Sequence, residues 1–192
     1  MCHVRPNDPN FYQLLLRIDQ DYADHAREQG CHCGGVLHSA RYPRKPRGVS
    51  HEARCHCDFR YSFCCADCRR RTTPVSVRFL GRRVYVGAIM VAVSATRASA
   101  GSAAAIRQLD DLGVPPATIA RWRNWWTTDF VSTPFWTLGR AAFMPPIDTG
   151  LAPASLLERF VAGRPPGPLL SLLQWLSPLT SASAMGAVRD GR

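Results

Sequence analysis

The clustering of cysteine in one part of the chain constrains the fold more than any other feature. Seven of the eight cysteines fall between Cys31 and Cys68, and only Cys2 stands apart. Residues 1–10 lack the cationic and apolar regions of a secretion signal, so we expect a cytoplasmic protein with reduced thiols. Clustered cysteines in that environment more often bind metal than form disulfides. The first expectation is therefore a metal-stabilised fold.

Two cysteine pairs have the spacing of a tetrahedral metal site. Such a site needs four soft ligands, usually supplied as two close pairs on separate turns. One C-x-x-C pair and one tighter C-x-C pair followed by two glycines meet this need, and glycine permits the tight backbone turn. We predict a three-stranded zinc ribbon over residues 30–82 that binds Zn²⁺ through Cys31, Cys33, Cys65 and Cys68. The sequence does not separate zinc from iron, although four thiolates in a ribbon favour zinc.

The other cysteines of the cluster leave alternatives open. In the run 55–63, Cys55 and Cys57 alternate with polar residues, which is typical of a strand with one apolar face. We therefore interpret both as small buried hydrophobic residues. The alternative is that they join the site or form a second one with histidine. Cys64 is a possible replacement for Cys65, with C-x-x-x-C spacing.

Positive charge gathers in the same segment. The chain has a net charge of +10, and residues 41–83 carry twelve Arg or Lys side chains against three acidic ones. A basic patch of this density is typical of proteins that bind a polyanion, most often nucleic acid. The alternative is that the arginines only balance the charge of the metal-bound thiolates. The predicted phosphate contacts are Arg44, Lys45, Arg47, Arg69, Arg70 and Arg71.

Residues 83–130 fit a helix-turn-helix. A first helix is expected over 102–113, with Gly113 in the turn and Pro116 at the start of the second helix. The positions expected to pack the two helices together are Leu112, Val114, Ile119 and Trp122. Arginine and asparagine suit guanine and adenine edges in the major groove. The side chains expected to point away from the core, toward DNA, are Thr118, Arg121 and Asn124. A purely structural helical hairpin is the alternative.

Periodicity predicts the remaining elements of an α+β protein. Residues 8–29 form an amphipathic helix that Gly30 ends. Its expected apolar face consists of Phe11, Leu14, Leu15, Ile18 and Tyr22. A strand is predicted over 75–79, short helical segments over 131–180, and a disordered tail over 181–192. The longest apolar stretch, 84–96, is too short to span a membrane.

Three motifs carry a resemblance to a known family. They are "CHCGG", "FCCADCRRRTTP" and "LGVPPATIARWRNWW", in that order. Together they resemble the N-terminal zinc-ribbon and helix-turn-helix portion of bacterial insertion-sequence transposases. The stretches "YPRKPRG", "TPFW" and "FMPP" are similar to uncharacterised bacterial proteins of mobile elements. The resemblance implies DNA binding in a transposition context and supplies no catalytic residue.

We expect this chain to have no catalytic activity of its own. A transposase catalytic domain needs three metal-binding carboxylates on a large sheet, and after Phe130 the only acidic residues are Asp148, Glu158 and Asp190. No base that would activate a catalytic cysteine can be identified. The main hypothesis is therefore an accessory or regulatory protein that binds double-stranded DNA. The sequence pattern does not distinguish a preference for DNA from one for RNA. The rival is an interaction adapter, in which "LLSLLQWLSPL" docks a partner protein or a second copy.

Overall fold

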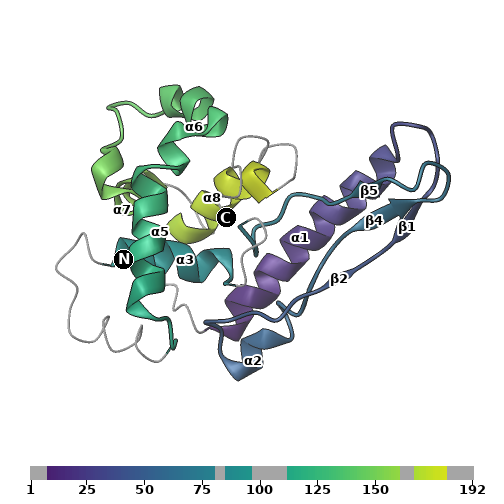
Figure 1. Ribbon diagram of the computed structural model, residues 1–192, viewed down its shortest axis with the longest axis horizontal. Coiled ribbons are helices and arrows are strands. Elements are labelled where there is room, and N and C mark those ends of the chain that lie inside the picture. The colour runs from purple at the N-terminus through teal and green to yellow at the C-terminus, as the bar shows by residue number, and fades with distance from the viewer. Residues whose placement is uncertain (1–7, 81–84, 97–111, 161–166, 181–192) are drawn as a thin grey trace. The chain divides into compact units, whose positions relative to one another are not determined.

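The computed structural model describes residues 8–80, 85–96, 112–160 and 167–180, which fall into two units (Figure 1). The cysteine-rich unit comprises residues 7–86 together with 176–185, and the helical unit contains residues 87–175. The fold is a mixture of helices and small antiparallel sheets, which agrees with the predicted α+β class. The predicted tail, 181–192, lies outside the described residues.

The cysteine-rich unit begins with the long helix α1 (Pro9–Gln29). The Asp8 side chain accepts a hydrogen bond from the Asn10 amide at 2.9 Å, and Gly30 ends the helix with φ 71°. Its buried residues are Phe11, Tyr12, Leu15, Asp19 and Ala23. The predicted apolar face is therefore partly wrong, because Leu14 is 39% exposed while the carboxylate of Asp19 is buried.

Two small antiparallel sheets lie beside α1 (Figure 1). The three-stranded sheet has the order β1 (Leu37–Ser39), β4 (Phe63–Cys65) and β5 (Arg71–Thr72). A second sheet pairs β2 (Tyr42–Pro43) with β3 (Phe59–Arg60). Ala23 of the helix packs against Leu37, Phe63 and two cysteines in one apolar cluster. This cluster joins the C-terminal half of α1 to the three-stranded sheet.

The predicted strand alternation through Cys55 and Cys57 is wrong. Ser50 caps the short helix α2 (His51–Arg54) by accepting a hydrogen bond from the Ala53 amide at 3.3 Å. The chain therefore enters a helical turn that continues to Cys55, which is exposed. Cys57 is buried, as interpreted, but it does not lie on a strand.

The predicted strand over 75–79 is also wrong, because polar as well as apolar residues of this segment are buried. Ser76 and Arg78 are 3% and 0% exposed, and Arg78 forms an ion pair with Asp19 at 2.7 Å. The same carboxylate accepts hydrogen bonds from the Ser76 hydroxyl at 2.6 Å and the Val77 amide at 2.7 Å. The segment therefore wraps around a buried carboxylate instead of alternating between two faces.

The helical unit is built around aromatic side chains. Its helices are α3 (Gly87–Ala95), α5 (Pro116–Thr127), α6 (Pro134–Gly139), α7 (Ala154–Phe160) and most of α8 (Pro168–Leu176). Short 3₁₀ turns separate them: η1 (Phe130–Ser132), η2 (Arg140–Ala142) and η3 (Thr149–Leu151). Phe130 contacts Trp126, Trp136 and Trp175 with ring centroids 5.0, 5.3 and 6.3 Å away. These short helices agree with the segments predicted over 131–180.

The C-terminal end of α8 returns the chain to the cysteine-rich unit, where η4 (Ser177–Thr180) follows. The leucines of α8 are all buried: Leu169, Leu170, Leu172, Leu173 and Leu176. They form core and not the exposed docking face that the adapter hypothesis expects of this segment.

Candidate metal centre and the cations around it

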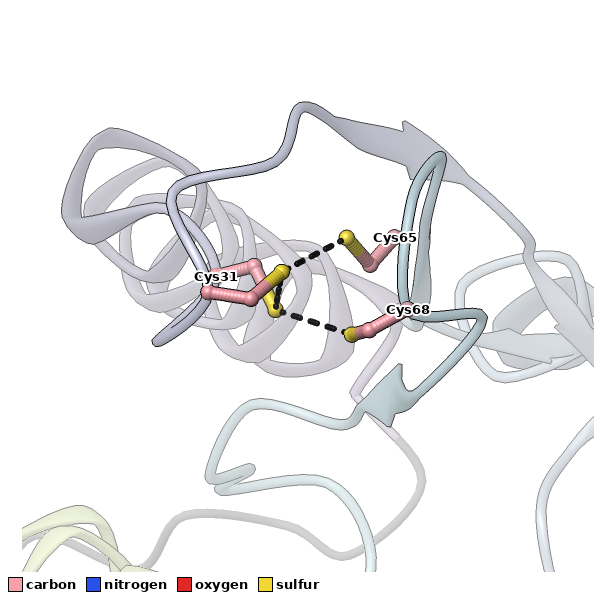
Figure 2. A group of neighbouring side chains, drawn as sticks. Cys31, Cys65 and Cys68 are labelled. Atoms are coloured by element: carbon pink, nitrogen blue, oxygen red, sulfur yellow. Dashed lines mark hydrogen bonds between the residues drawn. The ribbon is translucent and has the colours of Figure 1, made fainter.

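Four cysteines from two turns converge at one end of the three-stranded sheet. Cys31 follows the glycine that ends α1, and Cys33 lies two residues later. Cys65 ends β4, and Cys68 belongs to the turn that leads to β5. Figure 2 shows Cys31 on one side and Cys65 and Cys68 on the other, with the sulfurs pointing toward one another. These are the four cysteines that the spacing predicts as ligands.

The sulfur positions fit a tetrahedral metal ion. All four Sγ atoms lie within 4.8 Å of one another. Three of the separations are 3.4 Å (Cys31 to Cys33), 3.5 Å (Cys31 to Cys68) and 3.5 Å (Cys33 to Cys65). Thiolates bound at ~2.3 Å around a tetrahedral zinc ion lie about 3.8 Å apart. A disulfide has its sulfurs at about 2.05 Å, so none is formed here. The four cysteines are thus grouped as a metal site requires.

The backbone of both turns is shaped to surround these sulfurs. The residue after the second cysteine has positive φ in each turn: 82° at Gly34 and 58° at Arg69. For a residue with a side chain this conformation costs about 1–2 kcal/mol. Gly35 has a different constraint, because a Cβ there would lie 2.7 Å from the Cys65 sulfur and 2.4 Å from a carboxylate oxygen of Asp67. The second glycine therefore gives the sulfurs room.

The thiols of the group have unequal proton affinities. The Gly35 amide, followed by contacts with the other sulfurs, lowers the pKa of Cys33 to about 6. At Cys31 the Cys33 amide lowers the pKa, but burial and the neighbouring thiols outweigh it and raise the pKa to about 12. The pKa of Cys68 is raised, because burial and neighbouring thiols outweigh the lowering by the Arg70 amide. Ionisation of one thiol therefore opposes ionisation of its neighbours, and a bound cation would stabilise the thiolates together.

The alternative ligands do not join this group. The Cys64 sulfur points to the carbonyl oxygen of Arg69 at 3.6 Å, so it does not replace Cys65. Cys55 is exposed and Cys57 is buried, and neither belongs to a group of potential ligands within the described residues. Burial raises the pKa of Cys57 to about 12, as expected for a thiol that serves as a small hydrophobic residue.

A histidine links the metal group to one of the predicted phosphate contacts. His32 Nδ1 lies 3.5 Å from the Cys31 sulfur, and its Nε2 lies 3.1 Å from a guanidinium nitrogen of Arg70. The sequence signal for this contact was the position of His32 between two ligands. The link brings a positive charge to the edge of the thiol cluster.

Most of the predicted cationic contacts lie on the surface. Lys45, Arg47, Arg69, Arg70 and Arg71 are exposed, and Arg44 is half-buried over the ring of Phe79. Within the described ranges, no carboxylate lies at salt-bridge distance from the five exposed cations. Two of the other basic residues counted in this segment are buried, namely Arg60 and Arg78. They serve the interior of the unit, and sequence reasoning did not separate them from the surface set.

Some of the cations are stacked on aromatic rings. The guanidinium carbon of Arg71 lies 4.9 Å from the ring centroid of Tyr42, which is 51% exposed. Arg41 is likewise exposed and lies 4.6 Å from the ring centroid of Phe59 and 5.7 Å from that of Tyr61. Stacking restrains a guanidinium while its donors remain free to bind a ligand in the plane.

Helix α5 agrees only in part with the predicted recognition helix. Thr118 is 8% exposed, so its predicted orientation away from the core is wrong. The reason is that Thr118, Trp122 and Trp126, spaced four residues apart, make one buried face. Arg121 and Asn124 are exposed, as predicted. The expected first helix, 102–113, lies almost entirely outside the described residues.

Comparison with protein-family models, with curated proteins and with solved structures finds no match. None of the described helices is long and apolar enough to cross a bilayer.

Proposed function

We propose that this chain is a zinc-stabilised protein that binds double-stranded DNA and has no catalytic domain of its own. The observation that carries the proposal is the set of exposed cations on and around the turn that follows Cys68, without carboxylate partners in the described part of the chain. Clustered and unneutralised cations favour a polyanionic partner. A role in a bacterial mobile element rests on the resemblance of the quoted motifs to insertion-sequence transposases.

Zinc is the metal that best suits the four cysteines. Four thiolates in tetrahedral arrangement select soft ions, and zinc provides a closed site with no redox chemistry. Strands of two or three residues contribute few hydrogen bonds, so metal binding would supply much of the stability of the two turns. Zinc would also reduce the repulsion among the thiolates. The cations beside the site would then be displayed from a rigid turn.

Helix α5 offers a second candidate contact with DNA. Its exposed Arg121 and Asn124 have the chemistry of base recognition, whereas the cations near the metal centre have that of backbone contact. Arg121 donates a hydrogen bond to the Thr118 hydroxyl at 3.1 Å, so it is already oriented by the helix surface.

Elemental analysis with thiol counting tests the metal part of the proposal. We expect one zinc per chain and four thiols that become reactive only after chelation. Protein purified under reducing conditions that contains no metal and binds none when zinc is added would overturn it.

Electrophoretic mobility shifts in graded salt test the DNA part. The wild type is expected to bind duplex at low salt, and the triple variant R69Q/R70Q/R71Q to bind much more weakly. The matched control is R17Q/R54Q/R140Q, which removes three other exposed arginines and the same net charge. Absence of wild-type binding to any duplex at low salt, or an equal loss in both triple variants, would contradict the proposal.

The adapter hypothesis remains a second candidate because the helical unit exposes large apolar side chains. Leu138 and Met144 are 80% and 82% exposed. Met144 lines a surface hollow of about 310 Å³ together with Trp136, Arg140 and Phe143. An exposed methionine beside a hollow lined by aromatic rings offers a partner an apolar surface. Sedimentation equilibrium of the wild type and of L138D/M144D tests this candidate through self-association. The adapter hypothesis expects the wild type to self-associate and the variant to lose this self-association.

A further inference from the structure

The two turns that supply the cysteines share a backbone conformation at one position but have different residues there, Gly34 in the first and Arg69 in the second. In each turn the residue after the second cysteine has positive φ. The first turn has glycine there, and a Cβ at Gly34 would meet nothing within 4 Å, so only the backbone conformation calls for glycine. The second turn has arginine at the same place, although glycine would relieve the strain. A side chain kept in a disfavoured conformation points to a role for that side chain.

The surroundings of Arg69 indicate what this role is. Its side chain is exposed and has no hydrogen bond or carboxylate partner among the described residues. No polar contact within the described part of the chain therefore accounts for an arginine at this position. The two arginines that follow it are also exposed; Arg70 is restrained by His32 and Arg71 by the ring of Tyr42. Three consecutive arginines are thus exposed: the turn fixes the backbone of Arg69, and a histidine and an aromatic ring restrain the guanidiniums of Arg70 and Arg71.

We propose that Arg69, Arg70 and Arg71 form a phosphate-binding turn that contacts the backbone of duplex DNA without reading its sequence, and that Arg69 is kept in its strained conformation for this contact. Guanidinium groups bind phosphate oxygens through paired N–H donors, and such contacts position a protein without specifying bases. The inference rests on the proposed function, because it assigns that binding to one turn. It goes further, because it predicts that Arg69 makes the turn less stable than glycine would and increases the affinity for duplex DNA.

The substitution R69G separates these two roles. Glycine is the residue that the backbone conformation prefers, so zinc content and melting temperature should be unchanged or higher. Affinity for duplex should fall about tenfold, equally for two unrelated duplexes of the same length. The slope of log affinity against log salt should become shallower by about one, as expected for the loss of one phosphate contact. R69K, which keeps the charge, should retain most of the affinity.

Fluorescence anisotropy with the zinc-loaded full chain measures these quantities, with R17Q as the matched single-charge control. Wild-type affinity and salt slope in R69G would overturn the inference while leaving the proposed function intact. Loss of zinc from R69G would also overturn it, because the side chain would then be structural. Tighter binding of the wild type to single strands than to duplex would overturn the choice of ligand. Absence of binding by the wild type would instead refute the proposed function itself.

Discussion

Replacement of Asp19 by asparagine should strongly destabilise the cysteine-rich unit. The carboxylate is 2% exposed and accepts hydrogen bonds from the Arg78 guanidinium, the Ser76 hydroxyl and the Val77 amide at 2.6–2.7 Å. Asparagine keeps the shape but removes the charge and turns an amide donor toward other donors. Arg78, itself 0% exposed, would remain buried without its counter-charge. Breaking a buried pair in this way costs about 3–5 kcal/mol, a large part of a total stability of about 5–15 kcal/mol.

The choice of assay follows from where the fluorophores lie. All five tryptophans belong to the helical unit, so their fluorescence does not report directly on the cysteine-rich unit. Far-ultraviolet circular dichroism during urea denaturation follows all helices, of which α1 is the longest described, and the alkylation rate of the buried Cys57 reports opening of the cysteine-rich unit itself. The matched control is D21N, an exposed aspartate on the same helix, for which we expect a change within about 0.5 kcal/mol.

A double replacement distinguishes the pair from its two members. In D19L/R78M both charges are replaced by apolar groups, and this variant should be more stable than either single substitution. A cost below about 1 kcal/mol for D19N, comparable to that of D21N, would refute the reasoning, because the pair would then contribute no more than an exposed one.

Two further outcomes are expected. G35A should weaken zinc binding about ten- to a hundredfold in a competitive chelator titration, because the alanine Cβ would lie 2.7 Å from the Cys65 sulfur. The control is V36A, at an exposed neighbouring position. An unchanged zinc affinity in G35A would contradict the geometry. Burial raises the pKa of Cys57 from 9.0 to about 12, so the unfolded chain loses this proton first and the associated stability is lost as pH rises from 9 toward 12. In urea denaturation at stepped pH the wild type should lose about 1.4 kcal/mol more per pH unit in this window than C57A, and equal slopes in the two proteins would show that the thiol is not linked to folding.

The metal group and the first helix could be predicted because their signals are local. Asp8, Pro9 and Gly30 mark the ends of α1 whatever the rest of the chain does. The ligand spacing likewise limits which thiols can meet. The preference for Cys65 over Cys64 was also confirmed, because β4 ends at Cys65 and the Cys64 sulfur does not belong to the group of four.

The buried polar network could not be predicted, because its partners are far apart in sequence. Asp19 and Arg78 look like surface charges in any local window, and only the folded chain shows them paired. Because of this pairing, Asp19 lies on the buried face of α1 while Leu14 is partly exposed. The pairing also buries Arg78, so the segment 75–79 does not alternate between a buried and an exposed face. At Cys55 the prediction failed for another reason, since the Ser50 cap selected a helical turn over a strand with the same pattern.

The return of the chain at η4 has a consequence for how this protein can be divided. Arg60 donates a hydrogen bond to the Thr180 carbonyl at 2.6 Å, and the Ser76 amide donates to the Thr180 hydroxyl at 2.8 Å. All three residues belong to the cysteine-rich unit, although Thr180 follows residues 87–175 of the helical unit in sequence. Residues 87–175 thus lie in sequence between two parts of the cysteine-rich unit, and no single cut separates the two units. A gene fusion or deletion that retained only residues up to Val86 would remove the Thr180 hydroxyl that accepts from the buried Ser76 amide, and the Thr180 carbonyl that is one of the acceptors of Arg60.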